Sequence, residues 1–374
     1  MNRATKSYLI LALCVLTFLQ MPIATEPPCS TSPADGFVKS TDAHLCLNGR
    51  EFKAIGVNSY GILAGYLGIG QINSQAPDPN TRLKEASENG LQIVRFWLDV
   101  QNSDYWFGRV YSKYNESQNH ASYFTALDRL VSDAKSNRVL LVPVLATAYG
   151  PWSRLGNGEN FWLIGSQTNL KFKEWVASIV GRYSNETQIA WWEIANEANY
   201  SAMSGSNRVG LSTVISWTAD MYHFVKSQDS NHLVSGGFNN TGNLDLDQFG
   251  QLNQPFDIAS IHIYEDDLYG LERGRGVLDN QAAIQAFVES YSKYSRDVLD
   301  KPLVFGEFNG DELTPNAWFV EKFLSVSLKN GNGALIWVWE EGPPTDSYYV
   351  SPSSTPEIVR TLRSFAMASN VRPQ

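Results

Sequence analysis

Short apolar segments recur along the chain, separated by longer segments in which apolar and polar residues are mixed. Each short segment is almost continuously apolar, which is typical of strands that are buried on both faces. In the longer segments the apolar residues recur every three or four positions, which predicts amphipathic helices. The predicted strands are 52–58, 91–97, 139–146, 189–196, 233–238, 258–264, 303–308 and 334–339. The predicted helices include 81–89, 123–135, 169–183, 209–226, 281–294 and 317–328.

Strands that alternate with helices predict a parallel sheet with right-handed crossover connections. Eight such units in about 300 residues have the size of a closed (β/α)8 barrel, the TIM barrel, which is an α/β fold. An open doubly wound sheet is the alternative, but no glycine-rich phosphate-binding turn follows the first predicted strand. We find no linker, repeat or low-complexity segment, so residues 25–374 are predicted to form a single domain.

Residues 1–24 have the pattern of a cleavable secretory signal peptide. Arg3 and Lys6 supply its positive start, residues 8–19 form a short apolar core, and Ala24 is a small residue suited to cleavage. An uncleaved signal anchor is the alternative. No other apolar run approaches the roughly 18 residues of a membrane span. We therefore expect a secreted, extracellular protein that has no membrane contact after cleavage.

Cleavage of the signal would also change the cysteine count. The chain has three cysteines. Removal of Cys14 would leave Cys29 and Cys46, which we expect to form one disulfide in an oxidising compartment. Four N-glycosylation sequons predict, in addition, a glycoprotein. They begin at Asn115, Asn185, Asn199 and Asn239.

The charge balance limits the class of partner. The formal net charge is −9, and no cluster of lysine and arginine is present, which argues against nucleic acid as a ligand. Eleven tryptophans and seventeen tyrosines offer flat apolar faces that suit sugar rings. The sequence has no HExxH motif and no cysteine–histidine cluster, so we expect neither a metal nor another cofactor. We expect a monomer whose partner is a neutral polysaccharide.

Two carboxylates fall where a barrel carries its chemistry, at the carboxyl ends of the strands. Glu197 follows the fourth predicted strand and Glu307 lies in the seventh, so the two should face each other across the mouth of the barrel. Paired carboxylates among aromatic residues are typical of glycoside hydrolysis. One carboxyl protonates the departing glycosidic oxygen, and the other attacks the anomeric carbon or activates a water molecule.

Five motifs, in order along the predicted strands, resemble glycoside hydrolase family 5. They are Arg95, the Trp-Glu-Ile-Ala-Asn-Glu segment 192–197, His262-x-Tyr264, Gly306-Glu307-Phe308 and Trp339. The resemblance extends from about residue 36 to residue 365. It implies a catalytic domain that retains anomeric configuration by double displacement, with Glu197 as the acid/base and Glu307 as the nucleophile.

The resemblance also implies roles for residues around the two carboxylates. Arg95 and Tyr264 would hold and ionise Glu307. The sugar at the cleavage point would be held by a hydrogen bond to its 2-hydroxyl, by the pocket lining and by an aromatic floor. These three functions would belong to Asn196, His262 and Trp339, respectively.

Elementary electrostatics agrees with this assignment. The permanent charge of Arg95 should lower the pKa of Glu307, as a nucleophile at moderate pH requires. Apolar surroundings and the second negative charge should raise the pKa of Glu197, as an acid requires. Trp97 and Trp152 lie at or after strand ends, where aromatic rings would contact further sugar units.

Two positions depart from the pattern of the family. Ala198 stands where the family usually has proline, and Asn309 stands where it often has glycine. Both changes should affect loop shape more than chemistry. Glu193 lies four residues before Glu197, on the same side of a strand, and we interpret it as a buried structural carboxylate.

The substrate is predicted from smaller features. Cellulases of the family commonly carry an Asp-x-His element at the end of strand three, and residues 142–148 lack it. The opening at 56–60 and the form of the 192–197 segment are closer to endo-β-1,4-mannanases. The sequence therefore predicts a secreted enzyme that hydrolyses β-1,4-mannan. A cellulase or other β-glucanase is the first alternative, and a barrel that binds glycan without cleaving it is the second.

Overall fold

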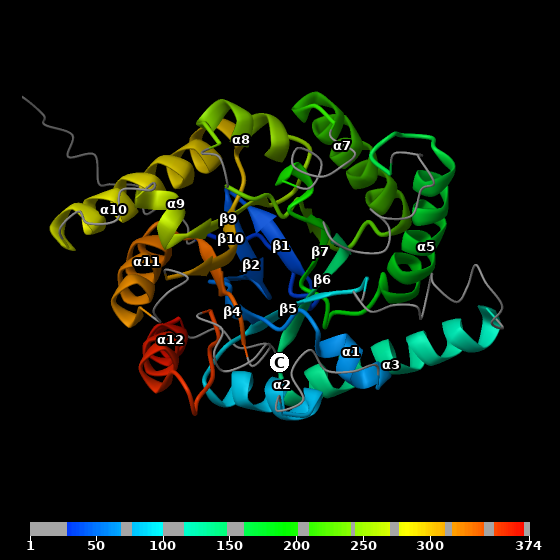
Figure 1. Ribbon diagram of the computed structural model, residues 1–374, viewed down its shortest axis with the longest axis horizontal. Coiled ribbons are helices and arrows are strands. Elements are labelled where there is room, and N and C mark those ends of the chain that lie inside the picture. The colour runs from blue at the N-terminus through cyan, green and yellow to red at the C-terminus, as the bar shows by residue number, and fades with distance from the viewer. Residues whose placement is uncertain are drawn as a thin grey trace, which may run out of the picture.

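The fold is a closed barrel of eight parallel strands surrounded by helices (Figure 1). The computed structural model describes residues 28–68, 77–99, 116–147, 161–200, 209–240, 244–269, 277–310, 316–339 and 348–369. The barrel strands are β4 (Ile55–Asn58), β5 (Ile93–Trp97), β6 (Leu140–Thr147), β7 (Trp191–Asn196), β8 (Leu233–Ser235), β9 (Ala259–Tyr264), β10 (Leu303–Asn309) and β11 (Gly333–Ile336). Each predicted strand has its counterpart among them.

Closure of the barrel joins β8 to β9. The other neighbours pair in the order β8-β7-β6-β5-β4-β11-β10-β9. Parallel bridges from Ser235 to Ile258 and from Asn239 to His262 connect the two ends of this order. The sheet is therefore continuous, and the predicted (β/α)8 barrel is confirmed.

Helices form the outer ring (Figure 1). They are α1 (Ile62–Leu67), α2 (Pro79–Glu88), α3 (Glu116–Asn137), α5 (Gln167–Tyr183), α7 (Leu211–Gln228), α8 (Leu246–Asn253), α9 (Glu265–Tyr269), α10 (Val277–Tyr294), α11 (Ala317–Lys329) and α12 (Pro356–Ala368). The six predicted helices are present, and α2, α3, α5 and α10 begin two to seven residues earlier than predicted. None of the described helices is long and apolar enough to cross a membrane.

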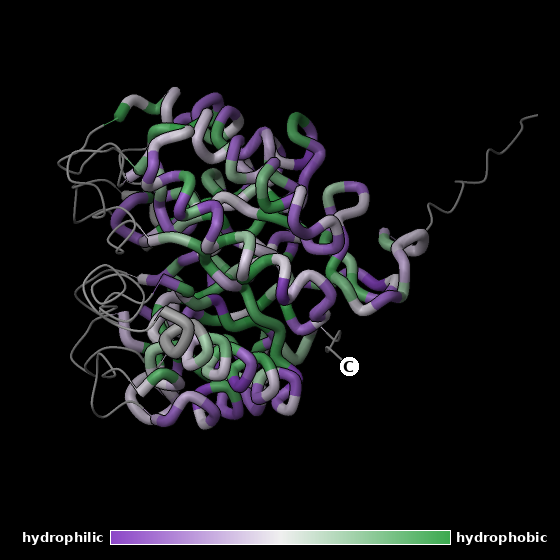
Figure 2. Tube along the Cα trace, turned by 90° about the vertical axis from the view of Figure 1, so that its right-hand side faces the viewer, coloured by the Kyte–Doolittle hydropathy of each residue, from purple (hydrophilic) through white to green (hydrophobic). Residues whose placement is uncertain are grey.

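The alternation of side chains along a strand positions the site. In β5, Val94 and Phe96 belong to the large apolar cluster between the strands and the helices. Ile93 belongs instead to a second cluster inside the barrel, with Trp191 and Leu335. Since side chains alternate between the two faces of a strand, Arg95 also points into the barrel, above this second cluster. Figure 2 shows that hydrophobic residues gather toward the centre of the molecule and hydrophilic residues toward its exterior.

A small antiparallel sheet covers the amino-terminal end of the barrel (Figure 1). It comprises β1 (Val38–Thr41), β2 (His44–Leu47) and β3 (Arg50–Glu51). The sequence pattern does not predict this sheet, because its strands are short and mixed in polarity. Three of its apolar side chains join the cluster inside the barrel, so the sheet closes the interior from below. They are Val38, Leu45 and Leu47.

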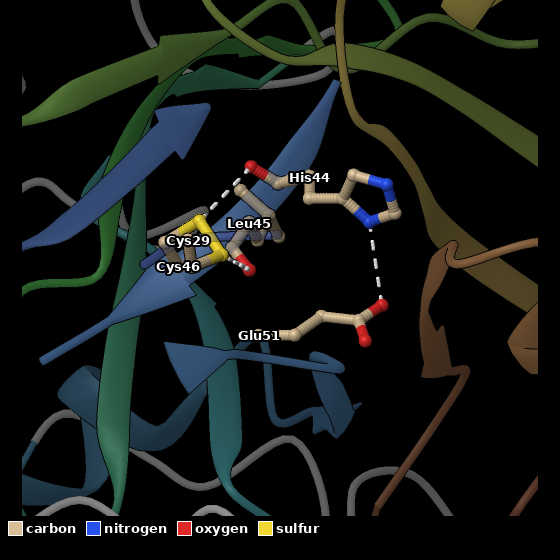
Figure 3. The surroundings of a disulfide bond; sticks show 5 residues. All are labelled: Cys29, His44, Leu45, Cys46 and Glu51. Atoms are coloured by element: carbon tan, nitrogen blue, oxygen red, sulfur yellow. Dashed lines mark hydrogen bonds and ion pairs between the residues drawn. A yellow bond between two sulfur atoms is a disulfide. The ribbon is translucent and has the colours of Figure 1, made fainter. Parts of the chain in front are cut away.

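A disulfide anchors this sheet. Cys29 and Cys46 are bonded, with their Cα atoms 5.5 Å apart, as predicted. Figure 3 shows His44 and Glu51 facing each other beside the bond, with 3.3 Å between Nδ1 and Oε1. The disulfide fixes the segment before β1 onto β2. The predicted signal peptide 1–24 lies outside the described residues.

Candidate active site

Arg95 is the centre of a buried polar network at the mouth of the barrel. Its side chain is completely buried. Nη1 donates to Glu307 Oε1 and to Asn58 Oδ1, both at 2.7 Å. Nε and Nη2 donate to Glu193 Oε1 at 3.0 and 2.5 Å, and Nη2 also donates to Asn196 Oδ1 at 2.7 Å. A buried guanidinium needs such partners, because an unpaired charge in the interior is strongly destabilising.

Glu307 is held through both oxygens. Oε1 accepts from Arg95, and Oε2 accepts from the Tyr264 hydroxyl at 2.5 Å. His262 Nδ1 lies 3.5 Å from Oε1. The preceding residue, Gly306, leaves room for this histidine, since a Cβ there would lie 3.0 Å from His262 Nε2. The structure thus brings Arg95 and Tyr264 onto Glu307, as the sequence predicts.

Glu197 lies directly after β7 and has an unusual backbone conformation. Its φ angle is 54°, in the left-handed region that residues with a side chain rarely adopt. Its amide nitrogen donates to Gly237 O at 2.7 Å. Gly237 must be glycine there, because its φ is positive and a Cβ would collide with Ala195 O and with the Glu193 carboxylate. The backbone contact and the close packing together set the direction of Glu197.

Two donors reach the same oxygen of Glu197. Asn239 Nδ2 donates to Oε1 at 2.6 Å, and His262 Nδ1 lies 3.1 Å from it. His262 therefore stands between the two carboxylates. Glu197, Glu307 and His262 each offer an atom within 4.8 Å of the other two.

This spacing has a chemical meaning. Carboxyls about 5–5.5 Å apart suit a retaining glycosidase, whereas inverting enzymes separate them by about 6.5–9.5 Å to admit water. The same three side chains have the donor types of a metal site. A cation placed there would compete with Arg95 for Glu307 Oε1 and with Asn239 for Glu197 Oε1. The arrangement thus suits two carboxyl groups that take part in a reaction better than it suits a metal ion.

The pKa directions of the two carboxylates differ from those predicted. Burial raises the pKa of Glu307, and the charges of His262 and Arg95 and the Tyr264 hydrogen bond offset this only in part. Burial also raises the pKa of Glu197, but the hydrogen bonds from His262 and Asn239 and the nearby charges outweigh it, so that this pKa is lowered. The predicted directions are wrong because burial dominates at Glu307, whereas hydrogen bonds and nearby charges outweigh burial at Glu197.

Arg95 and Tyr264 remain hydrogen-bond donors as the pH changes. Burial opposes the charge of Arg95, but the charges of Glu193 and Glu307 outweigh it and raise the pKa of Arg95. Burial and the two catalytic-site carboxylates raise the pKa of Tyr264 well above its ordinary value. The guanidinium therefore stays cationic, and the phenol keeps its proton as a donor to Glu307.

Comparison with known proteins gives the same resemblance. Residues 169–314 match the profile of the family described as GH family 5 beta-mannosidase-like. The predicted resemblance to glycoside hydrolase family 5 is confirmed. The chain is 24% identical to mannan endo-1,4-beta-mannosidase 5 of Solanum lycopersicum over 387 aligned positions, covering 88% of each chain. It is 22% identical to mannan endo-1,4-beta-mannosidase A of Hypocrea jecorina, covering 70% of this chain and 62% of the relative.

Solved structures have the same fold. The endo-1,4-beta-mannanase from Rhizomucor miehei superimposes with a TM-score of 0.68 at 18% identity, covering 89% of this chain and 99% of the other. The endo-beta-1,4-mannanase from Thermotoga petrophila gives a TM-score of 0.66 at 18% identity, covering 87% of this chain and 78% of the other. Both similarities concern the barrel architecture.

The aromatic floor predicted from the family 5 resemblance is not where it was expected. Trp339 is fully buried in the core, so the prediction that its side chain lies beneath the sugar is wrong. β11 ends at Ile336, earlier than predicted, and Trp339 instead pairs with Val350. Trp337 is half-buried and stacks on Tyr60, with ring centroids 5.1 Å apart. This ring, at the mouth, fits the role of a floor.

Other predicted aromatic positions have different outcomes. Trp97 is 6% exposed, and its ring centroid lies 4.6 Å from that of Tyr60 and 5.8 Å from that of Trp337. It therefore backs the aromatic cluster and presents little of its own surface. Trp152 lies outside the described residues. Glu193 is buried and paired with Arg95, as interpreted from the sequence.

Sequence reasoning gave no role to two polar residues of the network. Asn58 accepts from Arg95, and its amide donates to Gly306 O, Leu335 O and Ile336 O, which links β4 to β10 and β11. Its place at a strand end was the available signal. Asn239 attracted notice only as the start of a sequon, although it too follows a barrel strand.

Proposed function

We propose that this protein is a secreted, retaining endo-β-1,4-mannanase with Glu197 as the acid/base and Glu307 as the nucleophile. The observation that carries the proposal is the facing pair of buried carboxylates, which lie within 4.8 Å and are held by different donors. Arg95 and Tyr264 hold Glu307, whereas Asn239 and His262 hold Glu197.

The first step uses Glu307 as a carboxylate. One of its oxygens attacks the anomeric carbon while the glycosidic bond breaks and Glu197 gives its proton to the departing oxygen. Arg95 and Tyr264 orient the attacking group before the substrate arrives, which reduces the entropy lost in reaching the transition state. In the second step a water molecule gives a proton to Glu197 and attacks the ester, which releases Glu307.

The proton on Glu197 has to be explained, because the hydrogen bonds from His262 and Asn239 favour its carboxylate. A bound sugar displaces water from the mouth and strengthens the repulsion between the two carboxylates. Glu197 thereby gains a proton as substrate binds. When Glu307 becomes an ester its negative charge is lost, and the pKa of Glu197 falls again, which suits its second role as a base.

Mannan as the substrate is supported by the names of the relatives and by the absence of the Asp-x-His element. Mannose and glucose differ in one axial hydroxyl, so the polymer must be tested directly. The decisive measurement is the release of reducing ends from locust-bean mannan, carboxymethyl cellulose, xylan and barley glucan, with Glu307→Ala as the inactive control. We expect release from mannan, with products of several lengths.

The other outcomes have defined meanings. Release from barley glucan alone would make the enzyme a β-glucanase. Binding of a glycan without release from any polymer would make the protein a non-catalytic glycan-binding barrel. Secretion is tested by amino-terminal sequencing of protein recovered from the medium of a eukaryotic host, where we expect a start near residue 25.

A further inference from the structure

Asn199 and Asn239 form a clamp next to Glu197. Asn199 lies two residues after Glu197, and Asn239 lies beyond β8, where it bridges to His262. Asn199 Nδ2 donates to Asn239 O at 2.7 Å, and Asn239 N donates to Asn199 Oδ1 at 3.0 Å. One side-chain amide therefore satisfies both backbone groups of Asn239. Both asparagines are buried, with 3% and 7% of their surface exposed.

The clamp holds the backbone of Asn239, and the side chain reaches back to Glu197. Its Nδ2 points at Glu197 Oε1, 2.6 Å away. An amide nitrogen can donate but not accept, so this contact stabilises the ionised carboxyl more than the protonated one. Glu197 itself has a backbone conformation that costs free energy, which indicates that its surroundings hold it in place.

The sequence offers a competing reading of these two residues. Asn199 and Asn239 each begin an N-glycosylation sequon. A glycan would be attached to the same Nδ2 atoms that donate to Asn239 O and to Glu197. Burial and both hydrogen bonds would be lost on modification. The geometry therefore favours a role inside the site over a role as glycan acceptors.

We propose that Asn239, locked in place by Asn199, is a positioning residue that aims the acid/base carboxyl of Glu197. The proposal rests on the proposed function, because it gives Glu197 that role. Asn239 contacts the carboxyl of Glu197, and our scheme gives it no contact with the sugar. It acts through Glu197.

The effect of Asn239 on Glu197 can be distinguished from the effects of the charged and titratable groups nearby. Those that face it are His262 and Tyr264 on β9, Arg95 on β5, Glu307 on β10 and Asp267 on α9. Asn239 carries no charge and does not titrate. Replacing it by alanine removes a donor without changing the charge of the site. The pKa of Glu197 should then rise.

The test compares kcat/KM against pH for Asn239→Ala, Asn239→Asp and Asn199→Ala. On β-1,4-mannan we expect a loss of about tenfold or more for Asn239→Ala. An aryl β-mannoside with a dinitrophenolate leaving group needs little protonation, so its cleavage should fall much less. The alkaline limb of kcat/KM should move to higher pH, furthest for Asn239→Asp, because a second carboxylate then faces Glu197.

The matched control is Asn185→Gln. Asn185 begins a sequon too, but it is exposed and distant from the network. This variant should keep the wild-type pH profile. Equal losses on both substrates with an unmoved alkaline limb in all three clamp variants would overturn the proposal, since a purely structural residue behaves in that way.

A measurement that does not need activity separates this proposal from the proposed function. Carbon-13 labelled glutamate side chains can be titrated by NMR, with Glu197 identified by its loss in Glu197→Gln. The Glu197 signal should titrate at higher pH in Asn239→Ala than in the wild type. An unchanged titration would overturn the clamp, whereas a wild type inactive on every glycan would overturn only the proposed function. If Asn239→Ala does not fold, Asn199→Ala gives the same comparison.

Discussion

Asn309 donates a hydrogen bond from its side-chain amide to the backbone carbonyl of Trp337. The same amide donates to Tyr348 O at 3.2 Å. Asn309 ends β10 and occupies the position where the family often has glycine, which cannot make either bond. The departure from the family pattern therefore ties together the segments that carry the half-buried Trp337 ring. Loop shape at this point depends on one side chain.

Replacing Asn309 by glycine should loosen that connection. We expect a rise in KM for mannan of roughly threefold to tenfold with a smaller change in kcat, because binding rather than chemistry depends on the Trp337 ring. Stability should fall by about 1–3 kcal/mol, the cost of leaving buried carbonyls without a donor. Steady-state kinetics and thermal unfolding measure the two effects. A change in kcat alone would contradict this account.

The two glutamates that we propose as the catalytic pair should respond differently to an external anion. Glu197→Ala should lose about 10²- to 10⁴-fold on mannan. It should still be glycosylated by an aryl mannoside with a good leaving group, and azide should then release a β-linked glycosyl azide. Glu307→Ala cannot form the ester, so azide should give the α-linked product by direct attack. Proton NMR distinguishes the anomers, and the opposite pattern would exchange the two roles.

Tyr264→Phe should change the acidic limb of the pH profile. The hydroxyl donates to Glu307 Oε2 and lowers the pKa of that carboxyl, against the effect of burial. Removing the donor raises the pKa further, so Glu307 becomes protonated at a higher pH and activity is lost sooner on acidification. We expect kcat/KM to fall by roughly tenfold on the acidic side, as for the loss of a bond to a charged group. A shift of the acidic limb to lower pH would argue against this role.

Stability in acid should depend on a buried pair behind β7. Asp229 Oδ2 accepts from His232 Nδ1 at 2.6 Å and from Trp192 Nε1 at 2.8 Å. Burial raises the pKa of Asp229, but the hydrogen bonds and charge of His232 and the bond from Trp192 outweigh it, so the pKa is lowered. The stabilisation is thus present above the unfolded-state pKa of about 3.9. It is lost as the pH falls through the lower, folded-state value.

Asp229→Asn should accordingly lower the free energy of unfolding at neutral pH by about 3–5 kcal/mol, the cost of breaking a buried pair. The difference from the wild type should shrink on acidification. The control is Asp128→Asn, since Asp128 pairs with Arg182 at 2.5 Å on the surface. That pair should contribute about 0–1 kcal/mol. Urea unfolding at several pH values compares the two variants, and equal effects would contradict the assignment.

Glycan occupancy should follow exposure rather than sequence. Asn185 is exposed, whereas Asn199 and Asn239 are buried in the site. In protein made through a eukaryotic secretory pathway, we expect a glycan on Asn185 and none on the other two. Mass spectrometry of glycopeptides tests this, with Asn185→Gln as the control. A glycan on Asn239 of active protein would contradict the contact with Glu197.

The barrel could be predicted from the sequence because its strands are buried on both faces. Such strands appear in the sequence as continuous apolar runs, and their predicted boundaries agree with the structure to within a few residues. The sheet β1–β3 could not be predicted, because its strands are short and half polar and their sequence pattern does not differ from that of a loop. Its burial depends on a barrel end that only the closed fold provides.

The site was predictable where function follows position in a strand, and less so elsewhere. Glu307 and Arg95 lie within strands, so their placement followed from the fold. The predicted role of Trp339 was wrong because β11 ends before the predicted strand does. Beyond the end of a strand, side chains no longer alternate between its two faces. Asn239 was missed because its contact with Glu197 joins two loops, and no spacing along the chain encodes it.

The balance of charge around Arg95 also affects which polymers can approach the site. Glu193, Glu197 and Glu307 place three carboxyl groups around one permanent cation, so the mouth has an excess of acidic groups. A negative electrostatic potential there would stabilise the oxocarbenium-like transition state, in which positive charge develops on the sugar ring. The same potential would repel strongly anionic polysaccharides such as pectate. We therefore expect the mouth to favour uncharged polysaccharides before any sugar hydroxyl is recognised.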